Sequence, residues 1–138
     1  MAVDPDIHAF VEAIGANAPS PGSDDFDKWK SIFKRSNYFR FCGKIMMVKI
    51  SRSEKPFWGA GKDILDLLNT LDDYYFVLLI SSREGWVFSK SEVNAHIRSK
   101  KWNLRVADNN YKINSPLPDK NSFFSPENFL KRVGLADG

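Results

Sequence analysis

The chain has 138 residues, of which 43% are apolar, 27% charged and 14% aromatic. This length and apolar content predict one domain with a single core, and they exclude a disordered chain. The only cysteine, Cys42, excludes a disulfide framework and every multi-cysteine metal site. No apolar run approaches the roughly 20 residues of a membrane helix, and no basic signal sequence opens the chain. We therefore expect a soluble cytoplasmic protein.

Charge is distributed unevenly along the chain, although the net charge is only +3. Residues 1–27 contain six acids and no base, whereas residues 28–62 contain ten bases and one acid. Residues 63–82 are acidic again, and residues 83–138 are basic. A block of positive charge repels itself unless acids elsewhere in the fold or phosphates outside it offset the charge. The pattern favours a polyanionic partner, and a solvated surface of locally paired charges is the alternative.

The first part of the chain is predicted to be a short helix followed by a linker. Apolar residues recur at helical intervals over residues 6–14, and Gly15 ends the pattern. Residues 17–23 are rich in Pro and Ser, as loops are. We therefore divide the chain into an acidic N-terminal helix and linker, residues 1–23, and a single α/β domain, residues 24–138.

The domain is expected to begin with a helix and a pair of strands. Residues 24–35 place their apolar side chains on one helical face, with acids in the first turn and bases in the last. Residues 38–50 favour strand, and Gly43 divides them into two strands or marks a bulge. Cys42 is expected to be a small buried residue there. Residues 51–61 are expected to be a loop, because a proline and two glycines interrupt them.

The middle of the chain combines a helix with the most apolar strand. Residues 63–71 carry a broad apolar helical stripe, and residues 75–80 are continuously apolar, as in a central strand covered on both faces. Residues 86–88 are expected to return beside that strand after a turn. Ser89 and Glu92 have the spacing of a capping box, which predicts a short helix.

The last third is predicted to contain two short strands and a final helix. The strands are expected at residues 102–106 and 111–113, and Ser125 followed by Pro126 is typical of a helix start. Gly134 is expected to end that helix. Taken together, these elements predict an α/β (α+β) fold, with a mixed central sheet of about 4–6 strands flanked by helices in a single domain.

Catalytic signatures are incomplete. The segment Gly59–Lys62 resembles part of a phosphate-binding loop, but Pro56 stands where the first glycine is required and Asp63 stands where Ser or Thr is required. His8 and His96 are the only histidines, and neither has the paired spacing of a zinc site. We therefore expect no cofactor and assign no catalytic residue.

Two basic segments that contain aromatic residues carry the leading functional prediction. Lysines and arginines contact phosphates, and an exposed aromatic ring stacks on an unpaired base. The alternative is that the rings anchor in the core and the bases are merely solvated. The predicted nucleic-acid-binding residues of the first segment, 44–62, are Lys44, Lys49, Arg52, Lys55, Trp58 and Lys62, beside Phe57. Those of the second segment, 98–105, are Arg98, Lys100, Lys101, Trp102 and Arg105.

The order of elements resembles the restriction-endonuclease-like superfold, whose members share a PD-(D/E)xK pattern. Met47-Val48-Lys49 falls where the Glu-x-Lys of that pattern would lie, residues 75–80 resemble the following core strand, and residues 85–93 resemble its strand-then-helix element. The resemblance implies a basic surface that faces nucleic acid. Because Met47 replaces the acid, it implies a relative that does not cut, or carboxylates supplied by Asp27 and Asp63.

Three functions from different classes remain open at this point. The first is a nucleic-acid-binding module without catalysis, whose partner is DNA or RNA. The second is a protein-interaction module, such as an adaptor or an enzyme inhibitor. The third is a magnesium-dependent nuclease with an atypical set of carboxylates, and only this one needs a cofactor. The acidic N-terminal segment is also expected to mask the basic region.

Overall fold

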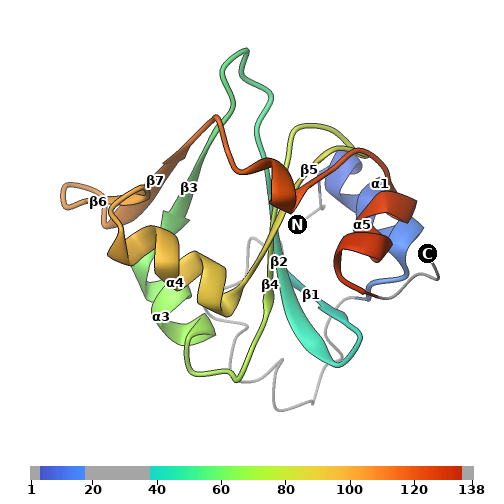
Figure 1. Ribbon diagram of the computed structural model, residues 1–138, viewed down its shortest axis with the longest axis horizontal. Helices are drawn as coiled ribbons and strands as arrows, with labels where there is room; N and C mark the ends of the chain where they lie inside the picture. Colours follow the sequence, from blue (N-terminus) through green and yellow to red (C-terminus); the bar gives the residue numbers. More distant parts are fainter. Residues whose placement is uncertain (1–3, 18–37, 135–138) are drawn as a thin grey trace.

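A five-stranded mixed sheet crosses the middle of the molecule (Figure 1). The computed structural model describes residues 4–17 and 38–134. In spatial order the strands are β1 (Tyr38–Phe41), β2 (Lys44–Ile50), β4 (Tyr75–Leu79), β5 (Gly85–Ser89) and β8 (Ser122–Phe123). β2 and β4 are parallel, and every other neighbouring pair is antiparallel. The apolar segment at residues 75–80 thus forms the central strand, as expected.

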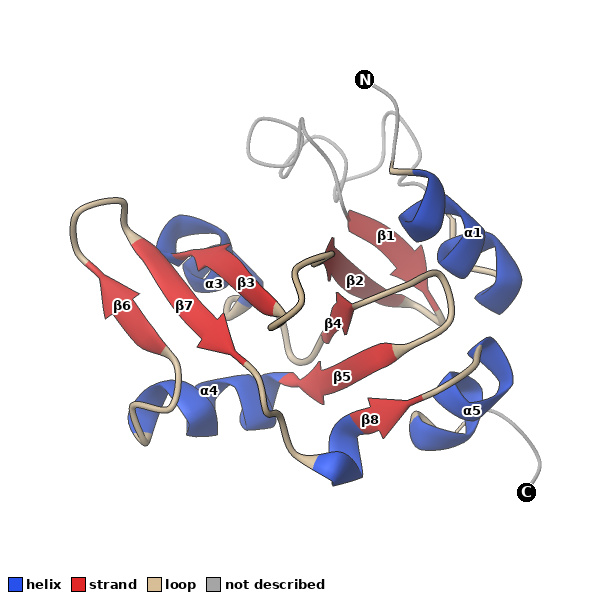
Figure 2. Ribbon diagram, turned by 90° about the horizontal axis from the view of Figure 1, so that it is seen from above, coloured by secondary structure: helices blue, strands red, loops and turns tan. Residues whose placement is uncertain are grey.

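Within the described residues, a second sheet and four helices pack on the two faces of this central sheet (Figures 1 and 2). The second sheet has the order β3 (Phe57–Gly61), β7 (Asn110–Asn114) and β6 (Asn103–Arg105), and all its pairs are antiparallel. On the same side lie α3 (Lys62–Leu68) and α4 (Lys90–Arg98). On the other side lie α1 (Pro5–Ile14) and α5 (Pro126–Arg132), and a 3-10 turn, η1 (Asp119–Asn121), precedes β8. The described residues therefore form one α+β domain, which confirms the predicted fold class.

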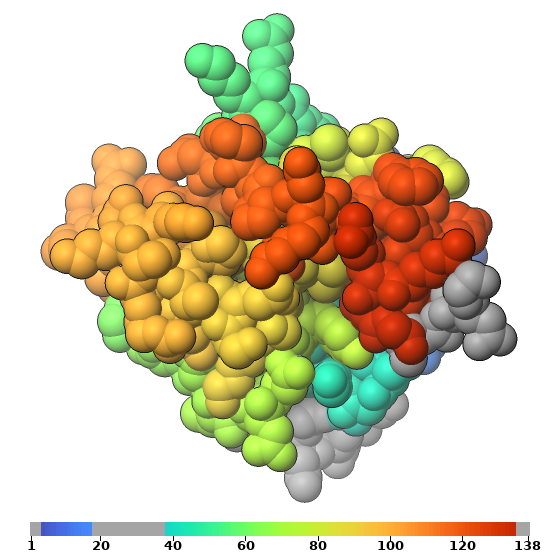
Figure 3. Space-filling view, viewed as in Figure 1, coloured from blue at the N-terminus to red at the C-terminus, as the bar shows by residue number. Residues whose placement is uncertain are grey.

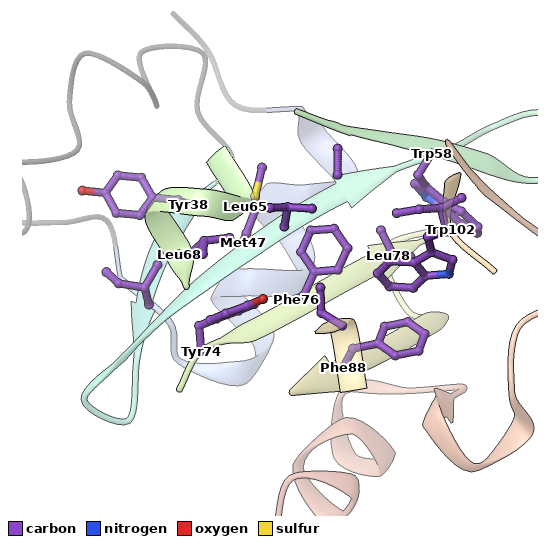
Figure 4. Close-up of a cluster of buried hydrophobic side chains, with 14 of the residues drawn as sticks. Tyr38, Met47, Trp58, Leu65, Leu68, Tyr74, Phe76, Leu78, Phe88 and Trp102 are labelled. Atoms are coloured by element: carbon purple, nitrogen blue, oxygen red, sulfur yellow. The ribbon is translucent and has the colours of Figure 1, made fainter. Parts of the chain in front are cut away.

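Alternation along the central strands sends apolar side chains to both faces. In β2, Ile45 and Met47 join the core under the second sheet, whereas Met46 and Val48 join the core under α1 and α5. β4 and β5 alternate in the same way. Figure 4 shows the first of these cores, where side chains from β2, β4 and α3 meet Trp58 and Trp102. The sheet is covered on both sides, which explains its continuously apolar strands.

The turn between β1 and β2 corrects one expectation. Cys42 is exposed rather than buried, because it forms a two-residue hairpin turn with Gly43. Both residues have positive φ, 51° and 78°, as the primed hairpin turns require. Glycine adopts this backbone without strain, so Gly43 favours the tight turn that connects β1 to β2. The prediction of two strands meeting at Gly43 is confirmed.

Residues 57–61 form strand β3, so the prediction of a loop from 51 to 61 is wrong in its second half. Trp58 and Ala60 point into the core, and the residues that alternate with them are the exposed Phe57 and the glycines Gly59 and Gly61. The strand is held by antiparallel pairing with β7, which lies about fifty residues later in the chain. Glycine spacing alone predicts a loop here, whereas the distant partner strand imposes extended backbone.

Helix α1 is an integral part of the core rather than a separate arm. The Phe10 ring packs against Phe123 and Phe129 at centroid distances of 5.5 and 5.2 Å, so α1 joins β8 and α5. The predicted helix over 24–35 and the predicted boundary at residue 23 lie outside the described residues. The described part of the acidic segment is thus docked on the sheet.

The helix starts predicted from capping residues are confirmed. Ser89 accepts a hydrogen bond from the Glu92 N–H at 3.3 Å, and Glu92 Oε1 accepts one from the Ser89 N–H at 2.9 Å. Ser125 caps α5 through the Asn128 N–H, with Pro126 at the first helical position. The Ser89–Glu92 capping box fixes the start of α4, whose far end carries the second basic segment.

Candidate functional site

Lys44 lies at the start of β2, where it supports the fold. Its Nζ is 3.3 Å from Asp73 Oδ2 and 5.2 Å from the centre of the Tyr75 ring. Burial alone would raise the pKa of Asp73, but the N–H groups of Lys90 and Tyr74 and the Lys44 ammonium outweigh burial and lower that pKa. Asp73 therefore remains ionised and ties β2 to the start of α4.

Arg52 follows β2 at its opposite end and is held by acids of α1. Its Nη2 donates to both carboxylate oxygens of Asp4 at 2.6 and 2.7 Å and to Asp6 at 3.0 Å. Asp4 is also the N-cap of α1, accepting from the Asp6 N–H at 2.9 Å. The hydrogen bond from Arg52 lowers the pKa of Asp4 below its ordinary value. The described part of the acidic N-terminal segment thus pairs with one of the predicted phosphate-binding cations, whose side chain remains 54% exposed.

Lys62 and Lys55 lie at two further places. Lys62 begins α3, forms an ion pair with Asp66 at 2.7 Å, and donates its N–H to Asn109 in the β6–β7 turn. Lys55 is exposed in the loop between β2 and β3. The first basic segment is consequently spread over separate regions of the surface, and three of its cations are paired with acids.

Lys49 is a partly buried cation among the predicted site residues. It is partly buried at the end of β2, and no hydrogen bond or ion pair engages it within residues 4–17 and 38–134. Burial lowers the pKa of its ammonium below the ordinary value. Its side chain lines an open crevice of about 470 Å³ between α1 and β3, together with Ser51, Arg52 and Trp58.

The tryptophans of the two basic segments are core residues, which corrects the expectation that Trp58 and Trp102 are exposed to a nucleic acid. Trp58 is 3% exposed, and its Nε1 donates to the Leu79 carbonyl at 3.1 Å. Trp102 is 2% exposed and packs edge-on against Phe88 at 5.1 Å. Both rings fill the space between the sheets, so they are inaccessible to an unpaired base, whereas Phe57 is 55% exposed.

The second basic segment is gathered where α4 ends and β6 begins. Ser99 caps α4, and Lys100 has a positive φ of 63°, which turns the chain back. The N–H groups of Lys101 and Trp102 then donate to the His96 carbonyl at 3.0 and 3.2 Å. This turn sends the Trp102 ring into the core and leaves the neighbouring cations in solvent.

The cations of the second basic segment, residues 98–105, are exposed. In the described part of the chain no acid forms an ion pair with any of them. The nearest acid in sequence, Asp108, is paired with Lys112 at 3.0 Å. Figure 3 shows α4 and the segment after it, in gold and orange, on one side of the molecule. We name this surface the α4–β6 cationic face and define it by Arg98, Lys100, Lys101 and Arg105.

A crevice of about 460 Å³ opens beside the cationic face. His96 stacks on Trp102 at a centroid distance of 4.8 Å and an interplanar angle of 18°. Burial, and then the charges of Lys101 and Lys120, lower the pKa of His96, so the imidazole is neutral at pH 7. The crevice is lined by His96, Lys101, Trp102, Asn114, Pro116, Leu117 and Pro118.

Sequence reasoning missed this crevice because its walls come from distant segments. Asn114 ends β7, and the proline-containing stretch after it carries no local sequence signal of a binding site. In the sequence, His96 carries no signal beyond the lack of the paired spacing of a zinc site. A stacked pair of aromatic rings six residues apart, at the end of a helix, is visible only in the fold.

The carboxylates required by the nuclease prediction are not assembled in the described part of the chain. Within residues 4–17 and 38–134, no three His, Cys, Asp or Glu side chains are placed to hold a metal ion. Asp27 lies outside the described residues, Asp63 is exposed on α3, and Met47 is buried in the core. The nuclease and the restriction-endonuclease-like resemblance stay predictions.

Comparison with known proteins yields no match to a family model, to a curated protein or to a solved structure. The function must therefore be argued from the site itself. Among the helices of the described residues, none has the length and apolarity needed to cross a membrane.

Proposed function

We propose that this protein binds nucleic acid through the α4–β6 cationic face. The observation that carries the proposal is the concentration of four exposed cations within residues 98–105, whose charges meet no acidic ion-pair partner in the part of the chain that the structure describes. Exposed Lys and Arg side chains contact phosphates and release the counterions around them. The cations of residues 44–62 contribute less, because Asp4, Asp66 and Asp73 hold three of them.

The turn after α4 gives this surface a stable base. The backbone is tied to the His96 carbonyl, and the Trp102 ring is locked between Phe88 and His96. The cationic side chains therefore extend from a fixed segment, which lowers the ordering cost of the backbone on binding. No enzymatic step is required for this function.

The experiment is fluorescence anisotropy with labelled single-stranded and double-stranded oligonucleotides across a salt series. Each neutralised phosphate contributes about −0.7 to the slope of log K against log salt for a single strand, so four contacts give a slope of about −3. We expect micromolar dissociation constants at low salt and a slope near that value. Absence of binding at low salt, or binding insensitive to salt, would contradict the proposal.

A second candidate, a protein-interaction module, is favoured by strand β6. This strand lies at the edge of the second sheet, and Val106 just after it is 85% exposed. A free edge pairs with an extended segment of another protein, and the adjacent cations would select an acidic one. Competition by poly-glutamate against the oligonucleotide separates the two candidates. Displacement at equal charge concentration would favour the acidic protein, and weak displacement would favour nucleic acid.

A further inference from the structure

The crevice beside the cationic face has the size and the lining chemistry to take a flat ligand that is attached to a phosphate. Its volume of about 460 Å³ lies within the usual range of small-molecule sites. Pro116, Leu117 and Pro118 give it an apolar wall, and Lys101 lies at its border with the cationic face. Lys101 therefore belongs to both surfaces, so a phosphate at this cation places the attached group next to the crevice.

The polar side chains of the crevice are available to form hydrogen bonds with a ligand. The Asn114 side chain is exposed, and within the described residues no hydrogen bond engages its amide. A free amide offers donors and acceptors to the edge of a planar heterocycle. Neutral His96 adds one donor and one acceptor on a ring already fixed by Trp102 and Phe88. Because the imidazole is held in place beforehand, little side-chain freedom is lost on binding.

We propose that this crevice receives one unpaired nucleobase, so that the protein recognises single-stranded nucleic acid in preference to a perfect duplex. The proposal rests on the function proposed above and names its substrate class. In a duplex the base edges are paired and the faces are stacked, so a base reaches a side pocket only after it is extruded. A single strand presents its bases without that cost. Phosphates on the cationic face and one base in the crevice then bind together.

The test compares three labelled probes of equal length by anisotropy at one salt concentration: a single strand, the same strand in a duplex, and a strand whose bases are replaced by abasic sites. The abasic strand keeps the phosphates and lacks the bases. The abasic strand cannot contact the apolar wall, the Asn114 amide or His96, so we expect the intact strand to bind at least about fivefold more tightly than the abasic strand, the low end of what one bound base contributes. We also expect the duplex to bind less tightly than the intact single strand.

Two matched asparagine variants locate the effect. Asn114→Ala removes the free amide of the crevice, whereas Asn103→Ala changes another exposed asparagine on β6 outside it. We expect Asn114→Ala to reduce the advantage of the intact strand over the abasic strand and to leave unchanged the slope of a separate salt series on the intact strand, and we expect Asn103→Ala to preserve that advantage. His96→Ala serves as a further variant, provided that its near-ultraviolet circular dichroism matches the unmodified protein.

The outcomes separate this inference from the function on which it rests. Equal binding of the intact and abasic strands, or binding of the duplex as tight as that of the single strand, would overturn the base-binding crevice and leave the cationic face in place. An equal effect of the two asparagine variants would also overturn it. Failure of all three probes to bind would overturn both proposals.

Discussion

The two basic segments of this chain have similar composition but different surroundings in the fold. In residues 44–62 the cations are separated by strands β2 and β3, and Asp4, Asp66 and Asp73 pair with three of them. In residues 98–105, Arg98, Lys100 and Lys101 lie around the turn after α4 and Arg105 ends β6, and in the structure's described ranges no acid forms an ion pair with them. A run of positive charge is therefore informative about function only when the position of the acids is known.

Two of the three acidic partners of the first segment come from far along the chain, whereas Asp66 lies one helical turn after Lys62. Arg52 meets Asp4 across 48 positions, and Lys44 meets Asp73 across 29. Charge neutralisation of this kind results from tertiary packing, because α1 and the β4 end of the sheet bring the acids to the cations. The tryptophans do not differ between the segments in this way. Trp58 of the first segment and Trp102 of the second are buried in the same core.

The largest effects are expected from these two tryptophans. Trp58→Ala and Trp102→Ala should each lower the free energy of unfolding by about 3–5 kcal/mol, because each ring fills a dense part of the core. Phe57→Ala is the matched control, since this ring is exposed and its loss should change stability by less than about 0.5 kcal/mol. Urea unfolding measures all three variants. If the Trp102→Ala protein is as stable as the unmodified one, the Trp102 ring does not contribute to the packing of the core.

A smaller effect should follow from the contact between α1 and the first segment. Asp4→Ala removes both the N-cap of α1 and the acceptor of Arg52, and cap removal costs about 1–2 kcal/mol. Asp66→Ala, which breaks only the exposed pair with Lys62, should have a smaller effect. Thermal unfolding compares them, and equal losses would show that Asp4 contributes nothing beyond a surface ion pair.

The effect of Asp4→Ala on stability should also depend on pH. The pKa of Asp4 is lowered in the folded state, so its contribution is present above the unfolded value of 3.8 and is lost as the pH falls through the lower folded value. The stability difference between the unmodified protein and Asp4→Ala should shrink across that acidic window. A difference that stays constant down to pH 2 would contradict the electrostatic part of the account.

The smallest expected effect is a gain. Lys49→Met replaces a partly buried ammonium, which has no ion-pair partner in the described part of the chain, with an apolar side chain of similar length. We expect stability to rise by about 1 kcal/mol at pH 7, near the lower limit for a polar group buried without a hydrogen bond. Lys55→Met, in the exposed loop, should leave stability nearly unchanged.

The pH dependence of folding stability tests separately whether burial of the Lys49 ammonium causes this gain. Because the folded pKa of Lys49 is lowered, the unfolded chain holds its proton more tightly between that pKa and 10.5, so stability rises with pH in this alkaline window. The gain from Lys49→Met should therefore decrease toward pH 10.5. Urea titrations at pH 7 and pH 10 measure this, and a gain that grows with pH would exclude desolvation as its cause.

Local sequence patterns predicted much of the fold. The apolar central strand, the Gly43 turn and the Ser89 and Ser125 caps depend on neighbours within a few residues, so their signals are readable in the chain. Strand β3 was not predicted, because its extended backbone depends on pairing with β7. Long-range pairing imposes structure that local propensity does not encode.

The candidate site was predictable only in part. The cations of residues 98–105 are visible as a charge run, and the crevice beside them is not. Asn114 and Lys120 reach the neighbourhood of His96 through the path of β7 and η1, and the stacking of His96 on Trp102 requires the turn at Lys100. Composition predicts that a basic surface exists, whereas packing decides which basic residues share it.

The most direct test of the central claim compares two variants of equal net charge by oligonucleotide anisotropy across a salt series. One carries Arg98→Gln, Lys101→Gln and Arg105→Gln, and the other carries Lys44→Gln, Arg52→Gln and Lys62→Gln. We expect the first to reduce the single-strand salt slope from about −3 to about −1, because one of four phosphate contacts remains, and the second to leave it nearly unchanged. Equal reductions, or a larger reduction in the second variant, would contradict the assignment of the α4–β6 cationic face as the binding surface.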